Sequence, residues 1–136
     1  MRDKIQKVLI YMARVYQPKR PALDPCPIEA VVSMIGGKWK ARILFILSKE
    51  SLAFASLCRT LGGISSEVLS TQLSGMERDG LVTRNQATTT ERHSGRYTLT
   101  EKGAQLVAVL LPVSDWASKQ LEEQGFYWSP PFVQSG

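Results

Sequence analysis

The chain has 136 residues, of which 17 are Lys or Arg and 12 are Asp or Glu, so its formal net charge is +5 at pH 7. This length supports one hydrophobic core with additional arms, and the positive balance favours polyanionic partners without establishing one. No apolar run is long enough to cross a bilayer, the N-terminus is unlike a signal peptide, and the two cysteines are too few for a disulfide scaffold or a zinc module. We therefore expect a cytoplasmic protein with no membrane partner, metal or cofactor.

Residues 1–17 have the spacing of an amphipathic helix. Their apolar residues share one helical face: Ile5, Val8, Leu9 and Met12. A single short helix is not stable alone, so we expect this one to act as a dimerisation arm. A stiff, proline-rich connector follows at residues 18–25, because proline fixes φ and removes a backbone donor.

Three helices are predicted in the next part of the chain. The first begins at Pro27 and ends before Gly36, with an apolar side at core spacing. The second runs from about Lys38 to Ser48, and we expect Trp39 in the core. A short extended piece at residues 52–53 precedes the third helix, which spans residues 54–61 and ends at a double glycine. The apolar residues of the first helix are Ile28, Val31, Val32 and Ile35.

The stretch from Ile64 to Arg84 predicts a helix followed directly by a strand. Ser65 or Ser66 can cap the helix, since a serine hydroxyl accepts a hydrogen bond from an unpaired backbone N–H group there. Apolar residues recur at spacings of four and three and give the helix one side to bury, while small, polar side chains occupy the opposite side. Gly80 is placed to end the helix. The predicted buried residues are Leu69, Leu73 and Met76.

The last third of the chain predicts a hairpin and a long helix. Strand candidates at residues 81–84 and 97–99 flank a polar loop, and Thr100 can cap a helix over residues 101–123 that Pro112 should kink. The apolar stripe of this helix is wider than a small core needs, which predicts a dimerisation surface. The tail, residues 124–136, is aromatic and proline-interrupted, and the pattern leaves a docked arm and a disordered end both open. The stripe comprises Leu106, Val109, Leu110, Val113 and Trp116.

This order of elements predicts an α+β, mainly α fold: a winged helix-turn-helix over residues 26–100, with a two- to three-stranded antiparallel wing sheet and dimerisation helices at both ends. In such a fold the second helix of the pair enters the major groove of double-stranded DNA, and the wing lies over the adjacent backbone or minor groove. The alternatives are that the basic residues are solvated surface charges, that Ser66 only caps its helix, and that Glu67 only complements the helix dipole. The predicted DNA contacts are Lys38, Lys40, Ser65, Ser66, Glu67, Ser70, Thr71, Ser74, Arg78, Arg84, Arg92, His93 and Arg96.

Three sequence motifs carry a family resemblance. They are CPIEAVVSMIGGKWKARILFIL at residues 26–47, GGISSEVLSTQLSGMERDGLVTR at 62–84 and YTLTEKG at 97–103. Together they resemble the HxlR-type, MarR-like family of winged-helix transcriptional regulators over residues 26–116. The resemblance implies a homodimer, held by its N- and C-terminal helices, that binds a palindromic operator. The family often carries Arg or Lys where this chain has Gln72 and Ser74.

Cys26 is a candidate redox sensor. It lies between two prolines at the start of a helix, where the positive helix end stabilises a thiolate, although Asp24 opposes that effect. The resemblance places it at the cysteine through which several family members respond to an oxidant, an aldehyde, a quinone or another small inducer. The alternative is an inert thiol beside the dimer interface. Cys58 shares a core face, and we expect it to be packed.

An enzyme is not expected, because the chain has one histidine, no carboxylate cluster and no phosphate-binding glycine loop. The leading hypothesis is a DNA-binding transcriptional regulator. The alternative is a winged-helix protein-interaction or small-ligand-sensing module with weak or no DNA binding. This alternative stays open because the predicted recognition helix carries one cation, Arg78, against three acidic residues. These are Glu67, Glu77 and Asp79.

Overall fold

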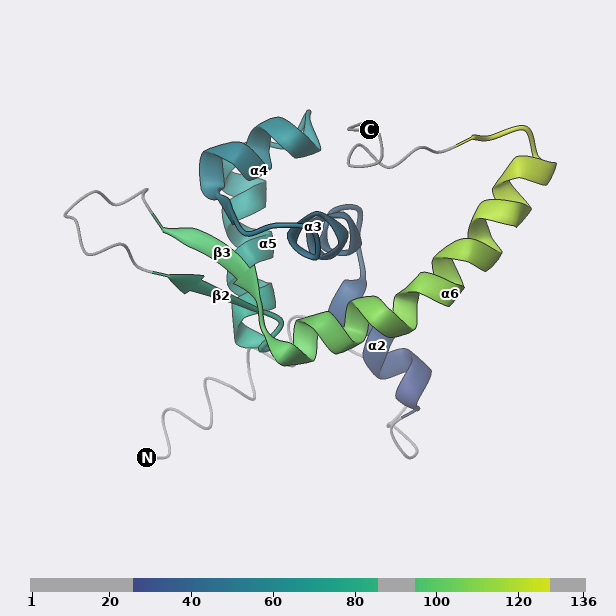
Figure 1. Ribbon diagram of the computed structural model, residues 1–136, viewed down its shortest axis with the longest axis horizontal. Helices are drawn as coiled ribbons and strands as arrows, with labels where there is room; N and C mark the ends of the chain where they lie inside the picture. Colours follow the sequence, from purple (N-terminus) through teal and green to yellow (C-terminus); the bar gives the residue numbers. More distant parts are fainter. Residues whose placement is uncertain (1–25, 86–94, 128–136) are drawn as a thin grey trace, which may run out of the picture. The chain divides into compact units, whose positions relative to one another are not determined.

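The computed structural model describes residues 26–85 and 95–127 (Figure 1). The chain divides into two compact units, one ending at Val32 and the other beginning at Ser33. Within the described ranges, no helix combines the length and apolar character needed to span a bilayer. Several predictions fall outside these ranges: the 1–17 helix with Ile5, Val8, Leu9 and Met12, the 18–25 connector, Arg92 and His93 in the wing loop, and the tail beyond Tyr127.

The described residues form five helices and three short strands. The elements are α2 (Pro27–Ile35), α3 (Lys40–Leu47), β1 (Leu52–Ala53), α4 (Phe54–Leu61), α5 (Ser66–Arg78), β2 (Val82–Asn85), β3 (Arg96–Leu99) and α6 (Glu101–Glu123). This composition confirms the predicted fold class, a mainly helical winged helix-turn-helix. The predicted domain boundaries after residues 17, 25 and 100 stay predictions.

The wing sheet has three antiparallel strands in the order β1-β3-β2. Leu52 of β1 and Arg84 of β2 both pair with Tyr97 of β3, so the short extended piece predicted at residues 52–53 is the third strand. Two further bonds hold β1 to β3: the Ser51 and Thr98 hydroxyl oxygens lie 2.8 Å apart, and the Arg96 guanidinium donates to the Ser51 carbonyl at 3.1 Å.

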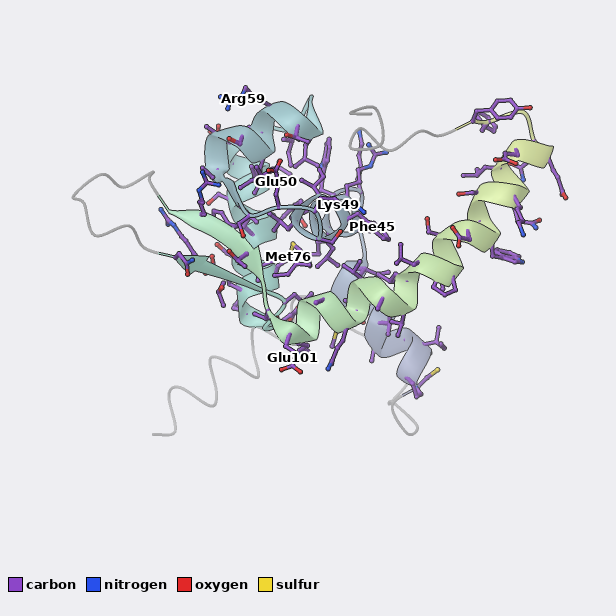
Figure 2. The ribbon with its side chains drawn as sticks, in the orientation of Figure 1. Phe45, Lys49, Glu50, Arg59, Met76 and Glu101 are labelled. Atoms are coloured by element: carbon purple, nitrogen blue, oxygen red, sulfur yellow. The ribbon has the colours of Figure 1, made fainter. Side chains whose placement is uncertain are left out.

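The core lies where α3, α4 and α5 meet the start of β2. Helix α3 is central, because it contacts α4, α5, α6 and β3. The side of α5 predicted to be buried is buried, and Figure 2 shows Met76 among these elements, whereas Arg59 and Glu101 project at the edges. Each such side chain contributes roughly 1.5–3 kcal/mol by leaving water. The fully buried set is Ile43, Leu44, Leu57, Leu69, Leu73, Met76 and Leu81.

Two predictions of buried apolar side chains are wrong. Helix α2 has no buried residue, and Ile28 and Val32 are 71% and 57% exposed. Periodicity identifies an apolar face but not what covers it. Trp39 is half-buried and precedes α3 as its N-cap residue, so the second helix begins two residues later than predicted.

Helix α6 contributes only its first half to the core. Leu106 and Leu110, predicted as dimerisation residues, are buried in the core of their own chain because α6 packs on α3 and β3. Val109, Val113 and Trp116 are 61%, 58% and 65% exposed. The helix continues through Pro112, and Figure 1 shows it bending about midway along its length, as proline in a helix predicts.

Residues at the first turn of α6 donate hydrogen bonds to three consecutive backbone carbonyls at the end of α5. The Thr100 hydroxyl donates to the Gly80 carbonyl at 2.6 Å, and the Thr100 backbone N–H donates to the Leu81 carbonyl at 3.0 Å. The Lys102 ammonium donates to the Asp79 carbonyl at 2.7 Å. Carbonyls at a helix end lack intrahelical partners, so these bonds satisfy groups that would otherwise need water.

Gly103 permits this close approach. It is buried in the first turn of α6, and a Cβ built there would overlap the Leu81 carbonyl oxygen. Its backbone N–H donates to the Thr100 hydroxyl at 3.0 Å, which confirms Thr100 as the cap of α6. The glycine that ends the YTLTEKG motif is therefore required, because the backbone of Leu81 occupies the space that a side chain would need.

Gly103→Ala should lower the free energy of unfolding by roughly 1–3 kcal/mol, since overpacking at a backbone contact forces α6 away from Leu81. Gly75→Ala, also within a helix, is the matched control, because a Cβ there meets only ordinary contacts at 3.7 Å and beyond. It should be neutral or stabilise by up to about 1 kcal/mol. Urea denaturation measures both, and a Gly103→Ala protein as stable as the wild type would contradict the packing.

Candidate nucleic-acid interface

Helix α5 presents one exposed side of short or polar residues, which we call the outward face. Its opposite side is buried in the core. Short side chains allow a helix to approach another surface closely. Several residues of this face also line an open surface hollow together with Glu77. The outward face comprises Ser66, Glu67, Ser70, Thr71, Ser74 and Arg78, all exposed and all predicted as DNA contacts.

Two hydroxyl groups at this helix have defined hydrogen-bond roles. Ser65 is the N-cap residue, and its hydroxyl oxygen accepts from the Val68 backbone N–H at 3.2 Å, leaving its O–H hydrogen able to donate. The Thr71 hydroxyl donates its hydrogen to the Glu67 carbonyl at 2.9 Å, so its oxygen can only accept a hydrogen bond from a partner outside the helix. In the major groove the amino groups of adenine or cytosine could donate that bond.

Trp39 orients two cations at the start of α3. The Lys38 ammonium lies 4.7 Å and the Arg42 guanidinium carbon 5.9 Å from its ring centroid, within cation–π range. Sequence reasoning missed Arg42, although its spacing of three residues from Trp39 indicates a shared helix side. Lys40 is half-buried and extends across to Gly75 of α5.

The base of the wing holds two exposed arginines. The Arg84 guanidinium carbon lies 5.8 Å from the centroid of the Tyr97 ring, its cross-strand partner, and Arg96 bonds the Ser51 carbonyl. A Cβ on Gly95 would lie 2.6 Å from the Asn85 carbonyl oxygen and 3.0 Å from the Arg84 Nε, so glycine is needed chiefly for the close approach to the Asn85 backbone.

Tyr97 stays protonated beneath Arg84. Burial raises the pKa of Tyr97 above its ordinary value; the Arg84 charge works against the rise and the Glu77 carboxylate adds to it. The phenol is therefore neutral near neutral pH and adds no charge to the base of the wing.

Sequence reasoning also missed Arg59, in the last turn of α4. It is exposed, and its guanidinium donates to the Ser56 hydroxyl at 3.2 Å. The first helix of a helix-turn-helix crosses the DNA backbone, so a cation here is a candidate phosphate contact. The apolar spacing used to predict α4 does not report on its exposed side.

The two cysteines differ in exposure. Cys26 is exposed, and its carbonyl accepts from the Ala30 backbone N–H at 3.1 Å at the start of α2. Cys58 is half-buried, and both thiols are free. Among residues 26–85 and 95–127, no cluster of His, Cys, Asp or Glu has the size needed to hold a metal ion.

The HxlR-like helix-turn-helix family matches residues 34–125, which include the helix pair, the wing strands and α6. The chain belongs to this family. It is a helix-turn-helix transcriptional regulator of the HxlR/MarR-like class, and not an enzyme.

Relatives of this HxlR-type regulator agree with that assignment. An uncharacterised HTH-type transcriptional regulator of Halalkalibacterium halodurans is 33% identical over 105 residues, which cover 76% of this chain and 92% of the relative. The redox regulator HypR, solved in its reduced form, has a TM-score of 0.66 and 28% identity over 73% of this chain and 99% of its own. Quinone-bound YodB of Bacillus subtilis has a TM-score of 0.59 and 30% identity over 69% of this chain and 99% of its own.

The predicted DNA contacts therefore form three described groups. Ser65 and the outward face lie on α5, Lys38 and Lys40 lie at the start of α3, and Arg84 and Arg96 lie at the base of the wing. Arg92 and His93 lie outside the described residues. Arg42 and Arg59 are further candidate DNA contacts, which the sequence alone did not single out.

Proposed function

We propose that this HxlR-type regulator acts as a homodimer that binds a palindromic operator, with α5 in the major groove. The outward face of α5 carries the proposal: six small or polar side chains are exposed together on a helix whose other side is firmly packed. Hydroxyl groups at Ser70 and Ser74 are one helical turn apart and suited to base edges. Arg78, at the end of the same row, is suited to a phosphate.

Neighbouring elements would supply most of the attraction to the DNA backbone. Cations from α3, α4 and the wing surround an α5 whose own cation, Arg78, is offset by Glu67 and Glu77. Backbone contacts give affinity and register, whereas base contacts give sequence preference. This division supports a regulator that selects its sequence through short side chains. The proposed backbone contacts are Lys38, Lys40, Arg42, Arg59, Arg84 and Arg96, together with Arg92 and His93 of the wing loop.

The exposed stripe on α6 supports the homodimer. Val109, Val113 and Trp116 are spaced by four and three residues, so they share one side of the helix. A second copy presenting the same stripe would cover it symmetrically. We propose that the helix predicted at residues 1–17 completes the interface through its own apolar side. Two copies place two α5 helices on two half-sites, which raises affinity without any new contact.

Selection from random-sequence DNA with the purified protein should enrich a palindrome whose affinity falls steeply with salt. Ser74→Ala should alter the base preference at one position in each half-site and leave the salt dependence unchanged. Ser48→Ala, which removes an exposed hydroxyl at the end of α3, is the control and should alter neither. Failure to enrich a palindrome would contradict the proposal and favour a protein-interaction or ligand-sensing role.

We further propose that Cys26 releases the operator when an oxidant, an aldehyde or a quinone reacts with it. Its thiol is exposed beside the first turn of α2, so a small electrophile can reach the sulfur. Addition of the thiol to a quinone forms one carbon–sulfur bond, moves the thiol proton to a quinone oxygen and needs no further oxidant. The likeness to HypR and to quinone-bound YodB supports this assignment.

Cys26→Ser should keep operator affinity and lose its sensitivity to added quinone. Cys58→Ser is the matched control, because this half-buried thiol should leave the quinone response intact. Electrophoretic mobility shift with and without quinone measures release, and intact-protein mass locates the adduct. A quinone response that persists in Cys26→Ser would exclude this residue as the sensor and leave the DNA-binding proposal standing.

A further inference from the structure

Two cations from different helices converge above one glycine of α5. A Cβ on Gly75 would lie 3.7 Å from the Lys40 ammonium nitrogen and 3.7 Å from an Arg78 guanidinium nitrogen. The two nitrogens are therefore no further apart than twice that distance. Lys40 comes from the first turn of α3 and Arg78 from the last turn of α5.

The stem of Lys40 covers Gly75 and brings the charge to the edge of the outward face. Gly75 is buried and Lys40 is half-buried, and the Lys40 Cε would lie 3.8 Å from the same Cβ position. Long basic side chains commonly pack their methylenes on a neighbour and keep the charged end exposed. Gly75 follows Thr71 by four residues and precedes Arg78 by three, so the ammonium lies beside the outward face rather than over its centre.

An anion placed between these two side chains could contact both charged ends, because both nitrogens lie near the same position above Gly75. When a helix lies in the major groove, base edges face the middle of its exposed side and backbone phosphates face its edges. Arg presents a planar fork and Lys a point charge, and both bind phosphate oxygens well. The opposite edge of the outward face carries Ser70 and Glu77, which offer no positive charge.

We infer that Lys40 and Arg78 together hold a single backbone phosphate of the operator, above Gly75. This inference rests on the proposed DNA-binding function and goes beyond it, because it assigns two side chains to one phosphate. The shared phosphate would link α3 to α5 and set how far α5 advances along the groove. Gly75 acts as a positioning residue, since a side chain larger than alanine would displace the Lys40 stem.

Methylphosphonate substitution, which neutralises one phosphate at a time, tests the assignment on the duplex recovered by selection. Wild-type protein should lose roughly tenfold in affinity at one phosphate of each half-site, as expected for bonds to a charged group. Lys40→Met and Arg78→Met should each bind roughly tenfold more weakly, and both should become less sensitive to neutralisation at that same position, because one of the two cations remains. Reduced sensitivity at different positions for the two variants would overturn the shared site.

Two further variants separate charge from geometry. Gly75→Leu keeps both cations but displaces their charged ends, so it should lose sensitivity at the same phosphate. Lys38→Met removes a neighbouring cation that lies on Trp39, and it should leave that sensitivity unchanged. Circular dichroism and native mass establish that each variant is folded and in the wild-type oligomeric state. If Gly75→Leu unfolds, the comparison of Lys40→Met with Arg78→Met still decides the question.

Inorganic phosphate provides an arm that is independent of DNA recognition. Adding phosphate to the wild-type protein should shift the side-chain nitrogen NMR signals of Lys40 and Arg78 together, with a common midpoint. If no duplex is enriched but both signals shift, the DNA proposal fails and the paired site stands as a site for free phosphate. A response of one signal without the other, or of neither, would overturn the pairing.

Discussion

The contact between the first turn of α6 and the end of α5 is the constraint on which the interface depends. Thr100 and Lys102 bond the carbonyls of residues 79 to 81, and Gly103 lies directly against Leu81. Helix α5 is thereby fixed to the helix whose exposed stripe we assign to dimerisation. Because packed backbone contacts of this kind do not deform smoothly, the dimer geometry would set the separation of the two α5 helices on DNA.

A second theme is that basic side chains around α5 are positioned by specific neighbours. Trp39 lies beneath Lys38 and Arg42, Tyr97 lies beneath Arg84, and Gly75 lies beneath Lys40. Ordering these long side chains before binding reduces the entropy lost when DNA arrives. The outward face of α5 can then carry mostly short side chains and a net charge near zero. Under the proposed function, this arrangement would allow α5 to carry Gln72 and Ser74 where the family resemblance leads us to expect Arg or Lys.

The sequence predicted the fold because its signals were local. Spacing and capping located α4, α5 and α6 to within a residue or two, and Ser65 and Thr100 are the N-caps. The errors concern what covers an apolar face: Ile28 and Val32 are exposed, whereas Leu106 and Leu110 are buried within their own chain. Periodicity alone cannot distinguish a core from a subunit interface. The contact of Lys40 with Gly75 joins two elements far apart in the sequence, which no spacing rule reports.

The central claim is that two α5 helices, one from each subunit, read the major groove with their outward faces. A cleavage reagent tethered at Ser74→Cys, in a protein that also carries Cys26→Ser and Cys58→Ser, tests it directly on the selected duplex. The account predicts cuts in the major groove at two symmetric positions, separated by one DNA turn of roughly 34–36 Å or a multiple of it. Cuts at a single position, in the minor groove, or equally from the same reagent tethered at the end of α3 through Ser48→Cys would contradict it.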